Sequence, residues 1–308
     1  MDKVLISGIT GFVGTNLKVY LRSAYETVGL SRSSENIQTL SYNKLTVDDI
    51  NSAEAFIHLA GKAHDLKKIS SENSYFEANT ELTKMLFDLF LKSNCKTFVF
   101  MSSVKAVADT VEGVLDEQIK PNPQTVYGKS KLMAEEYIQS LKIPKGKYVY
   151  ILRPCMIHGP DNKGNLNLLY NIIKKGIPYP LGKYENKRSF LSVDNLSFCI
   201  QSLIENKPAS GIYNIADDTA ISTNKLVAII AESLGKKPRI VKTPKSFIKF
   251  IVKIGDVLPL PINTERLDKL TENYCVSNKK IKEALNINLP LTSIDGFKKT
   301  LKTFKINS

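Results

Sequence analysis

The chain has 308 residues, 43% of them hydrophobic, which is enough to bury one large core or two unequal ones. Its net charge is +13, but the lysines are scattered as on a solvated surface, so we expect no nucleic-acid partner. No stretch reaches the ~18 apolar residues that a membrane span requires, so no membrane partner is expected either.

The N-terminus and the cysteines indicate a cytoplasmic protein. An acidic residue and a predicted strand follow Met1 at once, unlike a signal peptide. Cys95, Cys155, Cys199 and Cys275 lie far apart and form no Cys-x-x-Cys pair, so we expect reduced, mostly structural thiols. With three histidines and no clustered ligands, no metal site is expected.

The first predicted element is a buried strand at residues 3–7, followed by a glycine turn and a helix at 12–24. In this setting the first glycine allows a tight turn, the second lets a pyrophosphate approach the backbone, and the third lets the helix pack on the strand. The helix N-terminus supplies N–H donors for the phosphates. The predicted cofactor-binding residues are Gly8, Gly11, Phe12, Val13 and Gly14.

The second predicted strand, 27–31, ends without an acid. An aspartate or glutamate at this place binds the ribose 2′-hydroxyl of NAD. Here Ser31, Arg32 and Ser33 follow instead, and they suit the 2′-phosphate of NADP. We therefore favour NADP(H) over NAD(H), with the alternative that Arg32 is a surface loop residue.

Further strands and helices alternate along the first half of the chain. We predict strands at 55–60, 97–102 and 148–153 and helices at 74–92 and 127–141, while 44–47 is a poor candidate for a strand between them. This alternation predicts an α/β fold with a Rossmann-type, doubly wound parallel sheet.

The C-terminal half has a different character. We predict helices at 166–175 and 222–234, and a strand and helix at 190–205 that rejoin the first sheet. Residues 246–260 are strongly apolar but carry Lys249, Lys253 and Asp256, so we expect a helix packed in a small lobe rather than one lying on a membrane.

Tyr127 and Lys131 place a phenol and an ammonium one helical turn apart on the same face. A free tyrosine has a pKa near ~10, and we expect the nearby lysine to lower it. Such a phenol can exchange a proton with a sugar hydroxyl or carbonyl near neutral pH. The same spacing occurs at Tyr170/Lys174 and Tyr179/Lys183, so the surrounding motifs distinguish Tyr127.

These motifs follow one another in a familiar order. They are the glycine turn, His58-Leu-Ala-Gly61, Asn79 with Thr83, Met101-Ser-Ser103, Tyr127-Gly-x-Ser-Lys131, Arg153-Pro154, Ile157-His-Gly-Pro160, residues 188–194 and residues 213–217. Over essentially the whole chain they resemble the extended short-chain dehydrogenase/reductases. The similarity is greatest to the nucleotide-sugar epimerase, dehydratase and keto-reductase branch.

The resemblance implies two lobes. Residues 1–156 with about 190–215 would form the NAD(P)-binding domain, and about 157–189 with 216–308 a smaller mixed α/β lobe that binds the nucleotide-sugar substrate. It also implies a homodimer through the helices that carry Asn79 and Tyr127.

The resemblance also implies roles for individual residues. The catalytic candidates are Tyr127, Lys131 and Ser103. Besides the glycine turn and residues 31–33, the cofactor candidates are Leu59, Ala60, Gly61, Asn79, Ser102, Tyr127, Lys131, Pro154, Met156 and Ile157. The substrate candidates are Ser103, Val104, Asn165, Arg188 and Arg266, whereas Arg153 is expected to brace the fold.

One position departs from the family. Val104 stands where a serine or threonine usually hydrogen-bonds the substrate oxygen beside the tyrosine. Either Ser103 takes this role because the strand has already ended, or Tyr127 works without a hydroxyl partner. Neighbours on a strand face opposite ways, which argues against a simple exchange.

The resemblance leaves three functions open. A 4-keto-reductase acting on a nucleotide-linked hexose, with UDP the favoured nucleotide, is preferred. A UDP-sugar 4-epimerase that retains NAD is the alternative, and a non-catalytic NAD(P)-binding sensor is a further one. Lys105 and Ala106 replace the acidic groups that a 4,6-dehydratase needs, which argues against dehydration.

Overall fold

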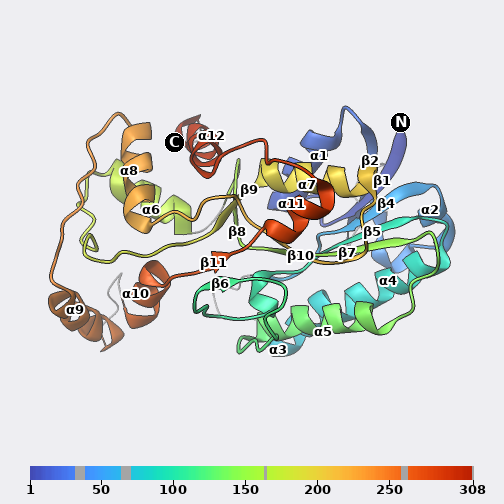
Figure 1. Ribbon diagram of the computed structural model, residues 1–308, viewed down its shortest axis with the longest axis horizontal. Coiled ribbons are helices and arrows are strands. Elements are labelled where there is room, and N and C mark those ends of the chain that lie inside the picture. Colours follow the sequence, from blue (N-terminus) through green and yellow to red (C-terminus); the bar gives the residue numbers. More distant parts are fainter. Residues whose placement is uncertain (32–38, 64–70, 163–164, 258–262, 307–308) are drawn as a thin grey trace.

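The centre of the protein is a seven-stranded parallel sheet with the strand order β10-β7-β5-β4-β1-β2-β3 (Figure 1). The computed structural model describes residues 1–31, 39–63, 71–162, 165–257 and 263–306. Within these ranges a few side chains are not described, among them those of Asn165 and Arg266. The strand order changes direction where β1 meets β4, which confirms the predicted Rossmann-type, doubly wound α/β fold.

The sheet consists of β1 (Asp2–Ser7), β2 (Tyr25–Ser31), β3 (Thr39–Ser41), β4 (Ala53–His58), β5 (Thr97–Met101), β7 (Tyr148–Pro154) and β10 (Gly211–Ile215). Two parallel pairs lie outside it: β6 (Val114–Leu115) with β11 (Cys275–Val276), and β8 (Met156–His158) with β9 (Phe190–Ser192).

The helices of the first half are α1 (Phe12–Leu21), α2 (Val47–Asn51), α3 (Glu72–Phe76), α4 (Leu82–Lys92) and α5 (Val126–Ser140). Those of the second half are α6 (Asn165–Lys174), α7 (Val193–Asn206), α8 (Thr223–Ser233), α9 (Lys245–Val257), α10 (Thr264–Thr271), α11 (Lys279–Leu285) and α12 (Ser293–Ile306). Short helical turns are η1 (Tyr42–Lys44), the π-helical η2 (Glu77–Glu81) and η3 (Val104–Ala106).

The sheet separates two hydrophobic cores because successive strand residues point to opposite faces. Val4 and Ile6 of β1 pack with residues of α1, α7 and α11, whereas Leu5 packs with residues of α2, α4 and α5. Figure 1 shows α1, α7 and α11 on one side of the sheet and α4 and α5 on the other. The continuous apolar runs of the strands therefore have a helix layer to cover each face.

A third hydrophobic core lies beside the sheet and is built from α6, α8, α9, α10 and α12 (Figure 1). It includes Tyr170, Ile230 and Phe297, which are almost fully buried. The domain boundaries predicted from the sequence stay a prediction, and this separate core supports them.

The doubt about a strand at 44–47 is confirmed, whereas one detail of the predicted sheet is wrong. Residues 44–47 form the end of a 3₁₀ turn and the start of α2, and the third strand is Thr39–Ser41. The strand at 190 pairs with β8, so it is β10 that joins the central sheet beside β7. The following helix, α7, does pack on the sheet domain, where it contacts α1.

All four cysteines are free thiols, and Cys95, Cys155 and Cys199 are buried. Within the described ranges, no helix has the length and apolar character needed to cross a bilayer.

An aromatic cluster makes the core under α4 sensitive to truncation. The Phe98 ring centroid lies 5.1 Å from those of Phe87 and Phe90 and 5.4 Å from that of Phe56. We expect Phe98→Ala to lower the free energy of unfolding by about 3–5 kcal/mol in urea denaturation, because the strands cannot close the cavity. The exposed Phe250→Ala is the matched control, with an expected change below about 0.5 kcal/mol. Equal losses in both variants would contradict the prediction.

Candidate active site

The glycine turn after β1 leaves no space for side chains. Gly8 has a φ of +74°, and a Cβ there would lie 2.8 Å from the backbone nitrogen of Ala60. A Cβ on Gly14 would lie 2.3 Å from the carbonyl oxygen of Gly8, a collision with backbone that no rotamer relieves. The turn therefore brings the start of α1 onto the carboxyl end of β1, beside the end of β4.

The N-terminus of α1 is suited to an anion. Gly11 is the N-cap residue; in this described segment no side chain caps the helix, and its first turn contains no acid. The first N–H groups and the positive end of the helix dipole can therefore face a phosphate. Phe12 lies near Gly159, and Val13 packs against the core. The cradle fits the diphosphate of a dinucleotide.

Buried hydroxyls hold a neutral histidine at the end of β4. Thr83 donates its hydroxyl hydrogen to the Asn79 carbonyl, so it accepts from Nε2 of His58 at 2.9 Å. Nδ1 of His58 then accepts from Ser7 at 2.6 Å, and Ser7 accepts from the Ala60 amide. Burial lowers the pKa of His58 to about 3, and the positive charge of Lys131 makes a smaller contribution in the same direction. His58 therefore braces the loop at Leu59 and Ala60.

Asn79 fixes the loop after β4 rather than facing a ligand. Its amide group donates to the Lys62 carbonyl and to the Ser130 hydroxyl, and its oxygen accepts from the Lys62 amide at 2.7 Å. Asn79 is fully buried, so the predicted direct cofactor contact does not fit its side chain. A Cβ on Gly61 would lie 2.7 Å from Asn79 Oδ1 and 3.0 Å from Lys131 Nζ, which places this loop against the lysine.

The start of α5 is positioned by a cap and a close approach. Thr125 is the N-cap residue and accepts from the Gly128 amide at 3.2 Å. A Cβ on Gly128 would lie 2.4 Å from the Lys105 carbonyl oxygen, so glycine lets α5 touch the turn after β5. That turn carries Ser103, whose hydroxyl lies close enough to the Tyr127 phenol to affect its pKa.

The Ser103 hydroxyl can act as a donor to the phenol. Ser103 accepts from the Lys105 amide at 3.2 Å and keeps its own hydroxyl hydrogen, which is available to the phenol oxygen. Burial raises the pKa of Tyr127, and the hydrogen bond with Ser103 acts in the opposite direction. The net direction is opposite to the lowering that we expected from Lys131, because desolvation is the larger effect.

Lys131 is buried beneath the site. Its Nζ donates to the Met101 carbonyl at 2.8 Å and lies 4.9 Å from the centroid of the Phe100 ring. Burial lowers the pKa of Lys131 to about 8, and the charge of Glu135 opposes this. At neutral pH the ammonium is mostly charged and sits at the carboxyl end of β5.

A buried ion pair lies one turn further along α5. Arg153 of β7 contacts Glu135 through Nη2 at 2.5 Å and through Nε at 3.0 Å. Ser102 donates its hydroxyl to the same carboxylate. Arg153 thus braces the site, as its position in the motif suggested. The Ser102 hydroxyl is bound to the Glu135 carboxylate, so it does not fit the predicted contact with the cofactor. The Glu135 partner was missed, although it lies four residues after Lys131.

The structure distinguishes Ser103 from Val104. The strand β5 ends at Met101, so both residues lie in the turn that follows it, and the alternation expected along a strand no longer applies. Ser103 reaches Tyr127, whereas Val104 is 4% exposed and packs in the core next to the sheet. The side chain of Val104 does not fit the predicted substrate contact.

The predicted nicotinamide neighbours lie on the same edge of the sheet. Pro154 ends β7, and Met156 and Ile157 begin β8 directly after it. Asn16 of α1 donates to the Pro160 carbonyl at 3.1 Å, so this segment passes beside the glycine turn.

Arg188 links the small lobe to the site. Its Nη2 lies 3.4 Å from Glu272 Oε1, and burial lowers its pKa. Its backbone pairs with Ile221 and Tyr274, and the Tyr274 hydroxyl donates to the Ala108 carbonyl in the turn region after β5.

Some predicted contacts cannot be placed. Ser31 ends β2, but Arg32 and Ser33 lie outside the described residues. Asn165 begins α6 and Arg266 belongs to α10, and their side chains also lie outside the description.

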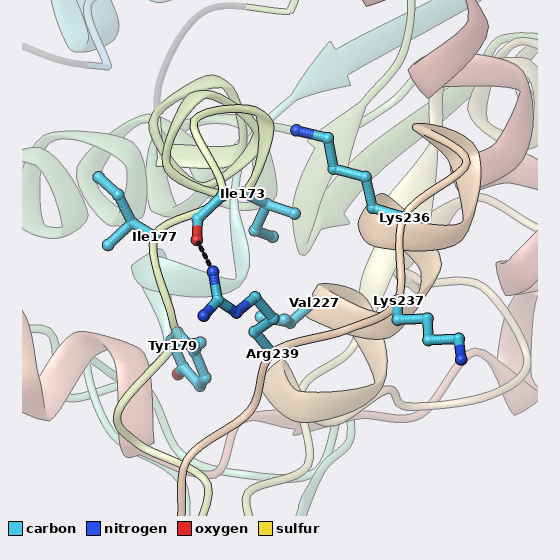
Figure 2. Close-up of a pocket in the computed structure, with 8 residues that line it drawn as sticks. Ile173, Ile177, Tyr179, Val227, Lys236, Lys237 and Arg239 are labelled. Carbon is cyan, nitrogen blue, oxygen red and sulfur yellow. Dashed lines mark hydrogen bonds between the residues drawn. The ribbon is translucent and has the colours of Figure 1, made fainter.

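A separate hollow of about 480 Å³ lies in the small lobe, away from Tyr127 (Figure 2). Ile173, Ile177, Tyr179 and Val227 form its apolar wall. Arg239 donates to the Gly176 carbonyl at 3.1 Å, just beyond the end of α6. In the part of the chain that the structure describes, no group of three or more metal-ligating side chains could hold a metal ion.

Residues 4–216 match the NAD dependent epimerase/dehydratase family. The chain belongs to this family. It is 31% identical to a UDP-glucose 4-epimerase of Vibrio cholerae over 98% of this chain and 95% of that protein. It is 24% identical to a GDP-6-deoxy-D-mannose reductase of Pseudomonas aeruginosa over 79% of this chain and 84% of the other.

A solved structure shares the fold. The UDP-N-acetylglucosamine 4-epimerase from Bacillus cereus superposes with a TM-score of 0.78 at 20% identity, covering 99% of this chain and 100% of that one. The protein is therefore an enzyme of the extended short-chain dehydrogenase/reductase class, as its motifs indicated.

The buried lysine of this epimerase-family site predicts a pH-dependent stability. The pKa of Lys131 is about 8 in the folded protein, against 10.5 for a free lysine, so between these values the unfolded chain binds more protons at this group. Its contribution to the free energy of unfolding therefore rises by about 1.4 kcal/mol per pH unit in this window and is least favourable below it.

We expect the difference in the free energy of unfolding between wild type and Lys131→Met, measured by urea denaturation, to rise between about pH 8 and about pH 9.5. Lys129→Met, at an exposed position of the same helix, is the matched control. Parallel pH curves for wild type and Lys131→Met would show that the ammonium is not desolvated.

Proposed function

We propose that the protein is a nucleotide-sugar 4-epimerase that works with retained NAD(H). The observation that carries this proposal is what one edge of the sheet brings together: the Ser103 hydroxyl close to the Tyr127 phenol, the buried Lys131 of α5, and a glycine turn suited to a dinucleotide. The Vibrio cholerae relative, similar over nearly the whole chain, is named a UDP-glucose 4-epimerase and supports this reaction.

The glycine turn would hold the diphosphate of a nicotinamide dinucleotide, and that group would supply the acceptance and return of hydride at C4 of the sugar. Tyr127 as the phenolate would take the proton of the C4 hydroxyl as the carbonyl forms, and as the phenol would give it back when the alcohol is restored. Ser103 holds the phenol by donating to its oxygen. Lys131 keeps a positive charge at the end of β5, where it favours the phenolate.

We propose a UDP-linked hexose as the substrate. Arg188, whose guanidinium pairs with Glu272 at 3.4 Å, is a candidate for the diphosphate, because a phosphate offers two oxygens to a guanidinium. Asn165 and Arg266 remain candidates for the same group.

A 4-keto-reductase using NADPH is the second candidate, as favoured from the sequence. The reductase from Pseudomonas aeruginosa supports it, and so does the end of β2, where Ser31 stands instead of an acid. The two functions use the same Tyr127 chemistry and differ in whether the cofactor leaves oxidised.

We also propose that the enzyme is a cytoplasmic homodimer. Four free cysteines suit a reducing compartment. Met85 of α4 and Met133 of α5 are exposed on the two helices predicted to form the dimer contact.

Replacing the phenol separates the candidate functions. For a 4-epimerase, NMR should show UDP-glucose and UDP-galactose interconverting without net cofactor reduction, and Tyr127→Phe should lower turnover by about 10²–10⁴-fold. Cofactor binding should be unchanged, because the hydroxyl is not part of the glycine cradle. Oxidation of NADPH with a UDP-4-keto-6-deoxy sugar, lost in Tyr127→Phe, would select the reductase instead. Unchanged turnover in the variant would contradict both.

Ser103 and Val104 provide a second test. We expect Ser103→Ala to lower kcat/KM on the order of 10²-fold, because the phenol oxygen loses its donor. Val104→Thr restores the hydroxyl at the usual family position but should give no gain, since this side chain points into the core. Activity retained in Ser103→Ala and increased in Val104→Thr would reverse the assignment.

A further inference from the structure

One segment holds more than half of the net positive charge of the protein. Residues 234–255 contain seven cations and no aspartate or glutamate, whereas the net charge of the whole chain is +13. All seven residues are exposed: Lys236, Lys237, Arg239, Lys242, Lys245, Lys249 and Lys253. The lysines are therefore less evenly scattered than we inferred from the sequence.

Helix α9, in the same segment, has two apolar faces. Ile248 and Val252 are buried in the core of the small lobe. Phe247, Phe250 and Ile254 are 55%, 62% and 38% exposed. At ~100° per residue, Phe250 lies about 200° around the helix from Val252, so the exposed stripe faces away from the lobe. The helix is packed in the lobe as predicted, but only by one face.

Lysines border the exposed apolar stripe. Lys249 and Lys253 lie one turn apart, between the buried and the exposed apolar faces. Lys245 begins the helix and lies with its Nζ 5.2 Å from the centroid of the Tyr184 ring. Asp256 is the one acid of α9, and it accepts hydrogen bonds from Thr264 at the start of α10.

The position of this segment makes it accessible to a large flat partner. Figure 1 shows α9, and the segment that joins it to α8, along the end of the molecule farthest from the central sheet. Figure 2 shows Lys236 and Lys237 at the start of the segment, extending away from each other. Lys236, Lys237 and Arg239 thus line the hollow of the small lobe, and the other four cations follow along the same segment.

We propose that this end of the protein docks on the surface of an anionic lipid bilayer. Phe247, Phe250 and Ile254 enter below the headgroups, and Lys249 and Lys253 meet the lipid phosphates. Amphipathic helices with an apolar face and flanking lysines lie in the interface in this way, and the apolar and electrostatic contributions add. The helix lies on the bilayer and does not cross it. This docking replaces our expectation of no membrane partner, which rested on the absence of a membrane-spanning stretch.

Other occupants fit less well. If a second copy of the chain packed on the same face across a twofold axis, the seven cations of one copy would face the seven of the other. Such a contact is repulsive. Single-stranded nucleic acid needs aromatic platforms within a basic groove, whereas this stripe includes Ile254 and stands on the outer face of a helix.

Vesicle sedimentation tests the docking independently of any enzymatic activity. We expect the full chain to sediment with phosphatidylcholine vesicles that contain about a third phosphatidylglycerol, and not with pure phosphatidylcholine. Phe247→Ser/Phe250→Ser and Lys249→Glu/Lys253→Glu should each weaken the partitioning by about tenfold or more. Val19→Ser/Val114→Ser and Lys18→Glu/Lys96→Glu, at exposed positions elsewhere, are the matched controls and should bind like wild type.

The absence of tryptophan from the chain gives a direct probe of insertion. The Phe250→Trp variant contains a single tryptophan. We expect its fluorescence emission to shift to shorter wavelength with anionic vesicles and to be quenched by brominated lipids. Val19→Trp, at a residue 59% exposed, should show neither effect.

Several results would overturn the proposal. These are a wild type that stays in the supernatant with anionic vesicles, a Phe247→Ser/Phe250→Ser variant that binds undiminished, or an unshifted Phe250→Trp spectrum. Binding to a single-stranded oligonucleotide without vesicle binding, or self-association lost in the phenylalanine variant without vesicle binding, would assign the surface to those partners instead.

Discussion

The ion pair of Glu135 with Arg153 is the constraint on which the site depends. Both side chains are almost fully buried, and a buried charge persists only when it is paired and hydrogen-bonded. The carboxylate also accepts from Ser102, so one group ties α5 to the ends of β5 and β7. This fixes the rotation of α5, and residues four and eight positions earlier, Lys131 and Tyr127, then face the same edge of the sheet.

Desolvation sets the charge state of the groups around that edge. It keeps His58 neutral, lowers the pKa of Lys131 and raises that of Tyr127. The phenol is therefore protonated at neutral pH in the protein alone, and the nearby Ser103 hydroxyl is the group that acts against the rise of its pKa.

Much of this organisation was predictable from local sequence. The glycine turn, the alternation of strands and helices and the Tyr127/Lys131 spacing are each set by residues close together in the chain, and all appear where expected. The third strand was not located from the sequence, because Thr39–Ser41 is short and only half-buried, so it carries little hydrophobic pattern. Asn79 and Ser102 were given cofactor roles because motif position does not show which partner a buried polar group finds.

The sequence by itself determined the parallel α/β fold, the glycine turn after β1 and the spacing of phenol and ammonium on one helix, because steric limits at glycine and helical periodicity act over a few residues. Tertiary structure alone decided that Ser103 rather than Val104 reaches Tyr127, since this depends on where β5 ends and how closely Gly128 lets α5 approach. It also decided that one apolar face of α9 is buried and the other exposed. Burial and desolvation are properties of packing between distant segments, and no local pattern contains them.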